Sequence, residues 1–342
     1  MSLSTDVADA AGEIAVSAPQ ASVAPCDAKQ RLPYPSQTSR KIVWRYAVPI
    51  VIVHLLALYA LVPWFFSWSG AALLWAGTYF YGGIGIDLCY HRQLTHRSFR
   101  TPRWLEHFFV LVSICCLEDA PASWVATHRQ HHNDSDHEED PHSPLVSFFW
   151  SHIGWLFVEN SACRTYSAFD RYARDILKDP FYMRLQRTLL PLWIYAAHAL
   201  AYFLAGFAVG YYLTPTWLAG VQLGLSWLVW GCLLRTVCVW HISWSVNSLT
   251  HVFGYRTYET EDNSRNNWLV AALTSGEGWH NNHHHDPASA KNGMRWWEFD
   301  LIYVMIEFLQ LVGLATHVIL PRDERRSKVT PRTESAAAEV TA

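Results

Sequence analysis

The pattern of apolar and polar residues along this chain is dominated by long apolar runs that alternate with polar stretches. A helix needs about 20 predominantly apolar residues to cross a bilayer. Four runs approach or reach that length: residues 46–66, 71–86, 189–212 and 217–234. The second run is the shortest, but its helix can extend towards Tyr90 and deliver His91 at its end. The pattern therefore predicts four transmembrane helices.

Short links join these runs in pairs and predict two helical hairpins. The links, residues 67–70 and 213–216, contain no Lys or Arg, whereas the N-terminal, middle and C-terminal regions contain many. By the positive-inside rule, those three regions are expected to be cytoplasmic. We thus predict an all-α, multi-pass integral membrane protein with both termini in the cytoplasm and a helical cap on the cytoplasmic side.

Two further apolar stretches are predicted to form helices that do not span. Residues 104–117 are too few to cross a bilayer and include Glu106 and His107, so we expect a helix in the membrane interface. Residues 301–320 should form a surface helix, with a fifth span as the alternative. Residues 1–39 and 321–342 are predicted to be disordered tails, which leaves residues 40–320 as one domain.

Composition supports a membrane protein and argues against several other classes. The 342 residues are 51% hydrophobic and 15% aromatic, and only 16% are charged. A net charge of -3 argues for no nucleic-acid partner. The seven cysteines are odd in number and include no CxxC, so neither a disulfide framework nor a thiolate metal site is expected.

Candidate chemistry lies in three histidine motifs, which hold eight of the 18 histidines. The spacing i, i+3, i+4 places three imidazoles on one face of a helix, and it occurs twice. The motif residues are His91 and His96 in HRQLTH, His128, His131 and His132 in HRQHH, and His280, His283 and His284 in WHNNHH. One such motif could arise by chance or lie on a surface helix. Three of them beside apolar segments predict a metal site, since imidazole is the commonest ligand for iron, zinc and copper.

The first motif does not fit a regular helix. Five residues turn about 140° past a full turn at 3.6 residues per turn. We therefore expect His91 and His96 to flank a helix end or a distortion, or to reach the metal from two sides. The independently predicted topology places all three motifs on the cytoplasmic side.

Together these motifs resemble those of the membrane fatty-acid desaturase family, of the Δ9 type. HRQLTH, HRQHH and GEGWHNNHH occur in the family's order, and Asp140–Ser143 and Asn247–His251 match as well. The resemblance runs from about Arg40 to Thr316. Related sterol and alkane monooxygenases usually carry HxxxH as the first motif, with one residue fewer.

The resemblance implies a di-iron centre with nine histidines and one asparagine. One iron would be bound by His91, His96, His128, His132 and His283, and the other by His131, His251, His280 and His284, with Asn247 through a water. Zinc would bind such a site at least as well, so iron is implied by the family alone. Among nearby carboxylates, Asp140 and Asp286 are the best candidates to accept hydrogen bonds from ligand imidazoles. His142 and His285 are not expected to be ligands.

The implied activity is O2-dependent formation of a cis double bond, at Δ9, in a saturated fatty acyl chain. The two electrons must come from a separate ferredoxin-like or cytochrome b5-like donor with its reductase, because the sequence contains neither HPGG nor a ferredoxin-like cysteine run. A related di-iron hydroxylase is an alternative. A membrane metal transporter or sensor is another, although transporters bind metal near mid-bilayer and these motifs lie at and beyond the ends of the predicted spans.

The residues expected to hold the substrate head group differ from those of animal acyl-CoA desaturases. Those enzymes usually carry Arg-Asp before the second motif and a basic pair after SHxGW, where this chain has Ala126-Thr127 and Glu159-Asn160. A carboxylate in place of a phosphate anchor is unfavourable. These differences put acyl-CoA in doubt but leave it open, since other arginines could serve. The strings from Trp124 to His132 and from Gly276 to His284 resemble bacterial and plastid-type relatives, some of which act on acyl chains already in glycerolipids.

Overall fold

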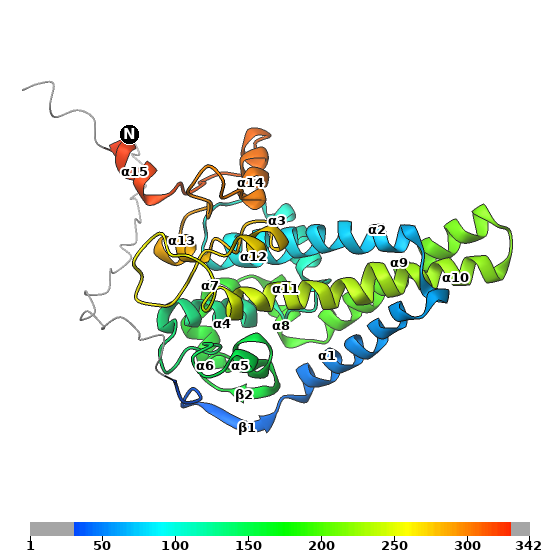
Figure 1. Cartoon of the computed structure of the whole chain (residues 1–342), viewed down its shortest axis with the longest axis horizontal. Coiled ribbons are helices and arrows are strands. Elements are labelled where there is room, and N and C mark those ends of the chain that lie inside the picture. Colours follow the sequence, from blue (N-terminus) through cyan, green and yellow to red (C-terminus); the bar gives the residue numbers. More distant parts are fainter. Residues whose placement is uncertain (1–30, 330–342) are drawn as a thin grey trace, which may run out of the picture.

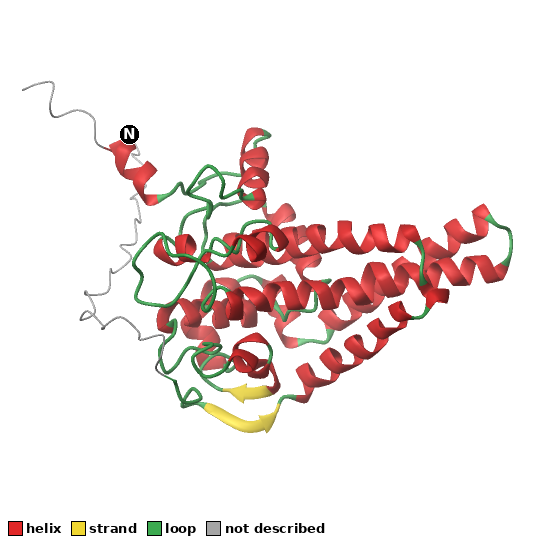
Figure 2. Ribbon diagram, viewed as in Figure 1, coloured by secondary structure: helices red, strands yellow, loops and turns green. Residues whose placement is uncertain are grey.

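A computed structural model describes residues 31–329, which are predominantly helical (Figures 1 and 2). Long helices form a bundle, and shorter helices and loops form a cap at one end of it. The predicted all-α class needs one correction. Strand β1 (Thr38–Ile42) pairs antiparallel with β2 (Val158–Asn160) at the edge of the cap. This small sheet brings the segment before the first long helix against the cap.

The bundle contains two hairpins that correspond to the predicted pairs of apolar runs. The first consists of α1 (Trp44–Ala57), with the 3-10 turns η1 (Leu58–Leu61) and η2 (Pro63–Phe65), and of α2 (Trp68–Gly77), which continues as the π-helical segment η3 (Thr78–Thr95). The second consists of α9 (Leu190–Leu213) and α10 (Trp217–Trp227), which continues through the π-helical η5 (Leu228–Leu234) into α11 (Arg235–Leu249). Ser67 and Thr216 cap α2 and α10, because their side chains accept hydrogen bonds from the first-turn amides of Gly70 and Ala219.

Three helices of the described chain are long and apolar enough to cross a membrane: Trp44–Leu61, Leu190–Leu213 and Trp217–Leu249. The second predicted span is not among them. Its helix does run on past residue 86, but η3 includes the buried polar residues Asp87, His91 and Arg92. Arg235, at the end of the fourth predicted run, lies inside a continuous helix and donates a 2.8 Å hydrogen bond to the carbonyl of Cys115.

The cap is assembled from many short helices that surround the bundle end. They are α3 (Arg103–Ile114), α4 (Pro121–Asp134), α5 (Phe148–His152), η4 (Gly154–Phe157), α6 (Tyr166–Tyr172), α7 (Arg174–Leu177), α8 (Pro180–Arg187), α12 (Trp268–Leu273), α13 (His280–His285), α14 (Leu301–Leu311) and α15 (Arg322–Val329). A core of buried apolar residues joins η3, α3, α4 and α8. The cap therefore packs on the end of η3 that carries the first histidine motif.

Two predictions for the C-terminal region and one for the N-terminus are corrected by these elements. The helix predicted over residues 301–320 stops at Leu311, two residues before Gly313 in a left-handed conformation (φ 76°), and is too short for a fifth span. The ordered chain also extends past the predicted tail boundaries. Leu32 donates to the carbonyl of Leu145 (3.1 Å), and α15 forms after residue 321. Residues 1–30 and 330–342 lie outside the described part.

Candidate metal centre

The first histidine motif lies at the end of η3, where the helix is distorted as the spacing required. In a π-helix the hydrogen bonds join residues five apart, and the amide of His96 donates to the carbonyl of His91 at 3.1 Å. This turn brings the two imidazole rings to 4.8 Å between centroids. The prediction of a distortion at HxxxxH is therefore confirmed.

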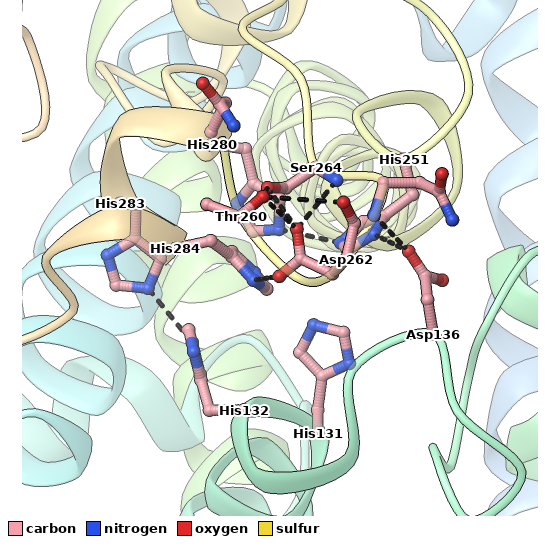
Figure 3. A network of polar contacts seen from close by, with 12 residues as sticks. His131, His132, Asp136, His251, Thr260, Asp262, Ser264, His280, His283 and His284 are labelled. Carbon is pink, nitrogen blue, oxygen red and sulfur yellow. Dashed lines mark hydrogen bonds and ion pairs between the residues drawn. The ribbon is translucent and has the colours of Figure 1, made fainter. Parts of the chain in front are cut away.

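The other two motifs lie on α4 and α13, and each helix turns its three histidines towards the interior of the cap. On α4, the Nε2 atoms of His128 and His132 are 3.1 Å apart. On α13, His283 approaches His132 across the cap, with 3.0 Å between their Nε2 atoms, as Figure 3 shows. On each helix one histidine has different neighbours from the other two: His131 on α4 and His283 on α13.

The nine histidines form two groups, in each of which one side-chain nitrogen per residue lies within 4.8 Å of the others. The five-histidine cluster contains His91, His96, His128, His132 and His283, and the four-histidine cluster contains His131, His251, His280 and His284. Figure 3 shows the four-histidine cluster beside His132 and His283. His251, which follows α11, joins the second cluster through a 3.1 Å contact with His280. The family resemblance, not the spacing, had pointed to this residue.

Four of the nine histidines have a carboxylate next to Nδ1, the ring nitrogen that points away from the cluster. Nδ1 lies 2.7 Å from Glu277 in His91, 3.0 Å from Asp140 in His131, 2.9 Å from Asp136 in His251 and 2.5 Å from Asp262 in His284. A carboxylate accepts the Nδ1 proton, so the Nε2 lone pair points into the cluster. Asp140 therefore accepts a hydrogen bond from one of the clustered imidazoles, as predicted.

Asp286 has other partners, and the prediction that it accepts a hydrogen bond from a ligand imidazole is wrong. It lies at the C-terminal end of α13, and its carboxylate accepts hydrogen bonds from the amide of Arg322 (2.7 Å) and the guanidinium of Arg325 (3.0 Å). Asp262 was not considered in the sequence analysis. It lies in a loop 22 residues before His284, and only tertiary packing brings the two together. Thr260 and Ser264 donate hydrogen bonds to the same carboxylate (Figure 3).

Burial favours the neutral form of most of these imidazoles. It lowers the pKa of each of the following residues well below its usual range: His96, His128, His131, His132, His280 and His283. His251 differs. Burial lowers its pKa, but the carboxylates of Asp136, Asp262 and Asp140 together outweigh burial and raise it to about 9. A cation at Nε2 would replace the proton that Asp136 stabilises there.

The residues present fit a pair of metal ions. Two nitrogen atoms bound to one metal at about 2.1 Å and roughly at right angles would be about 3.0 Å apart, which matches the Nε2 separations of 3.0–3.1 Å in both clusters. The Nε2 atoms of His96 and His284 are buried and have no hydrogen-bond partner within residues 31–329. Buried lone pairs that face one another are unfavourable without a shared cation.

His142 and His285 lie outside both clusters, and their not being ligands stays a prediction, since His142 belongs to a third group that could hold a metal ion. His142 packs against His131 with 4.3 Å between centroids, and forms a smaller group with His131 and Asp140. His285 stacks on Tyr258 at 4.0 Å. The register of the HHH run thus agrees with the family's motif.

A cavity of about 260 Å³ adjoins the five-histidine cluster. His128, His142, Trp155 and Asn247 line it near the histidines, and apolar residues such as Ile114, Trp240 and Trp244 line its remaining buried wall. Asn247 accepts a hydrogen bond from Ser151 through its backbone carbonyl (3.0 Å). Asn247 is a wall residue of this cavity, and the family resemblance names it as a ligand through a water.

Comparison with known proteins gives a consistent match over most of the chain. The family model described as fatty acid desaturase matches residues 67–318. The chain is 41% identical over 285 residues to an sn-1 stearoyl-lipid 9-desaturase of Anabaena variabilis, covering 83% of this chain and 97% of that protein. It is 42% identical over 282 residues to an sn-2 palmitoyl-lipid 9-desaturase of Nostoc sp. (strain 36), covering 82% and 92%. An acyl-CoA 5-desaturase of Anemone leveillei is 40% identical over 281 residues, covering 81% and 80%.

Proposed function

Because this chain belongs to the fatty acid desaturase family, we propose that it introduces a cis Δ9 double bond into a saturated acyl chain of a membrane glycerolipid. Two of the three relatives described above are lipid 9-desaturases and the third is an acyl-CoA 5-desaturase. The two lipid 9-desaturases support the Δ9 position of the double bond and a lipid substrate. Glu159-Asn160 in place of a basic pair supports a lipid substrate as well.

The observation that carries this proposal is the pair of histidine clusters beside a largely apolar cavity. We propose that the two clusters bind two iron ions, with Asn247 a ligand to the four-histidine side through a water. When bound, iron supplies the O2-dependent oxidation of an unactivated methylene, which no side-chain base can achieve. Per turnover, O2, two electrons and two protons combine with the two hydrogens removed from the substrate to give the alkene and two waters.

The protein's own residues orient and shield this reaction. Glu277, Asp140, Asp136 and Asp262 hold four ligand imidazoles in one tautomer. Trp124 stacks on His128 with 4.9 Å between centroids and fixes one wall of the cavity. Buried apolar side chains exclude water from the place where the acyl chain would lie.

The remaining proposals concern the cellular setting. We propose that α2 with the first part of η3 forms a fourth membrane-spanning segment, that residues 40–320 act as one domain, and that the cap and both termini are cytoplasmic. The electrons would come from a separate ferredoxin-like or cytochrome b5-like protein with its reductase, docked through the cap's basic side chains. The absence of Lys and Arg from both hairpin links supports this orientation.

The first test is a fatty-acid profile with located double bonds in a host that lacks its own Δ9 desaturase. The host would express the wild type or His132→Ala together with a compatible electron donor. We expect new Δ9 monounsaturated chains in the glycerolipids with the wild type alone, and loss of iron from the variant, since His132 faces both His128 and His283. Hydroxylated chains would instead indicate the hydroxylase alternative, and full activity of the variant would contradict the ligand assignment.

A further inference from the structure

The cavity beside the histidines has an exposed end as well as a buried one. Arg45, Thr188, Leu189 and Leu192 line it and are exposed, whereas Ile114 and Trp240 at the other end are 1% exposed. We call the set Arg45, Thr188, Leu189 and Leu192 the mouth. A chain that enters there would reach a cavity that Asn247, His128 and the buried Ile114 and Trp240 also line.

The mouth lies where two membrane helices begin. Arg45 is the second residue of α1, and Leu192 is the third residue of α9. Both helices belong to candidate spans. Leu189 is 66% and Leu192 is 45% exposed, and the neighbouring Trp44 and Trp193 are exposed as well. Exposed apolar side chains with tryptophans are typical of the membrane–water boundary, so the mouth opens there and not to bulk water.

A cluster of polar groups at the mouth suits a negatively charged head group. The guanidinium carbons of Arg45 and Arg164 lie 4.8 Å and 4.5 Å from the centroid of the Tyr46 ring. Arg45 donates to the Tyr46 hydroxyl (3.0 Å) and forms no ion pair with a carboxylate among residues 31–329. Asp119, which lies beside Tyr46, is already engaged, since it accepts hydrogen bonds from the Tyr46 hydroxyl and the amide of Ala120.

We propose that the mouth is a lateral entrance from the bilayer, and that Arg45 binds the phosphodiester of an anionic glycerophospholipid whose acyl chain occupies the cavity. Guanidinium groups pair with phosphate oxygens through planar, charge-assisted hydrogen bonds. The ester end of the lipid stays at the membrane boundary, and the chain reaches the histidines without leaving an apolar environment. This inference rests on the proposed lipid desaturase function and adds the head-group chemistry to it.

The test compares two distearoyl lipids presented in nanodiscs of an uncharged, oleoyl-chain galactolipid. One is phosphatidylglycerol and the other is a galactosyldiacylglycerol, and the purified iron-loaded enzyme receives electrons from a fixed donor. In Arg45→Gln we expect the ratio of kcat/KM for phosphatidylglycerol to that for the galactolipid to fall roughly tenfold, mainly through KM, and to recover partly in Arg45→Lys. Arg40→Gln is the matched control, an exposed arginine in β1 that does not line the cavity.

A second pair of variants tests whether the acyl chain enters the cavity through the mouth. Leu192→Trp narrows the mouth and should lower kcat/KM for both lipids, whereas Leu200→Trp, exposed on the same helix but away from the cavity, should not. An unchanged lipid ratio in Arg45→Gln would overturn the head-group assignment, and wild-type rates in Leu192→Trp would overturn the entrance. A wild type that desaturates stearoyl-CoA but neither lipid would refute the proposed function itself, so the two failures are distinguishable.

Discussion

At the residue scale, four carboxylates lie against Nδ1 of a clustered histidine and favour the tautomer that the proposed metal binding at Nε2 requires. Asp140, Asp136 and Asp262 accept a hydrogen bond from Nδ1 of His131, His251 and His284, and Glu277 lies 2.7 Å from Nδ1 of His91 as an ion-pair partner. Arg92 connects one of them to the protein core, since its guanidinium lies 2.7 Å from Glu277 and 2.9 Å from Asp300. The orientation of these imidazoles therefore rests on buried contacts with carboxylates, one of which is anchored by Arg92.

Removal of Asp262 should weaken metal binding more than removal of Asp286. Asp262→Ala leaves the His284 ring free to rotate, and loss of such a partner typically costs about 10–100-fold in metal affinity or activity. Asp286→Ala is the matched control, because Asp286 is also buried and close to the same motif but binds Arg325. Iron per protein, measured by mass spectrometry against a competing chelator, would check this. The opposite ranking would show that our choice of partner for His284 is wrong.

Glu118 should make stability depend on pH. It lines the cavity, and burial outweighs its hydrogen bonds with Ser243 and Trp124 and raises its pKa to about 8. An unfolded glutamate ionises near pH 4.3. Between about pH 4.3 and pH 8, Glu118 keeps its proton in the folded state and loses it in the unfolded state. The stability that Glu118 contributes is therefore fully present below about pH 4.3 and is lost as the pH rises through about 8.

The measurement is the thermal unfolding midpoint of Glu118→Gln and the wild type in detergent across that pH range. The glutamine variant should gain stability relative to the wild type as the pH rises towards 8, by on the order of a few kcal/mol, and the difference should level off above it. Glu259→Gln serves as control, because Glu259 is exposed. Parallel curves for Glu118→Gln and the wild type would contradict the burial of an uncharged carboxyl group.

At the element scale, the sequence predicted helices well where one physical signal dominated. Apolar length predicted α1, α9 and α10, and the spacing of His91 and His96 predicted the distortion that became η3. Helix ends such as that of α14 were missed, because a turn at Gly313 competes with the apolar pattern. The carboxylate at His284 was missed because loop packing, which has no periodic pattern, brings Asp262 to it.

Two pairs of glycines lie in the second hairpin, where α9 packs on α10. Gly206 and Gly210 on α9, and Gly220 and Gly224 on α10, form two GxxxG sequences that face each other across the second hairpin. A Cβ atom at Gly210 would lie 2.6 Å from the carbonyl oxygen of Ala219, and one at Gly224 would lie 2.7 Å from that of Phe203. The backbones therefore approach too closely for any larger residue.

Gly210→Leu should separate α9 from α10. Overpacking of this kind typically costs about 1–3 kcal/mol, and here the clash is with backbone, which cannot rotate away. We expect a lower unfolding midpoint and a smaller monodisperse fraction on size-exclusion chromatography. Leu204→Phe, a larger side chain at an exposed position of the same helix, should behave as the wild type. Equal yields for the two variants would argue against close glycine packing.

At the scale of the whole molecule, the polar cap and the two uncharged links define a direction across the membrane. We expect both links to face away from the cytoplasm and the loop at residues 259–261 to face it. Reporter insertions after Ser69, after Thr214 and after Glu259 would check this, with Glu259 as the cytoplasmic control. A cytoplasmic reporter at Ser69 would mean that α2 and η3 do not span, and that three spans are present.

The arrangement of the clusters also has a consequence for biosynthesis. The nine histidines are distributed from residue 91 to residue 284, and both clusters contain residues from α13 near the end of the chain. Neither cluster can close until most of the polypeptide has left the ribosome and the hairpins have entered the bilayer. Under the proposed function, iron would therefore bind only at the last step of maturation, after the whole chain has been made.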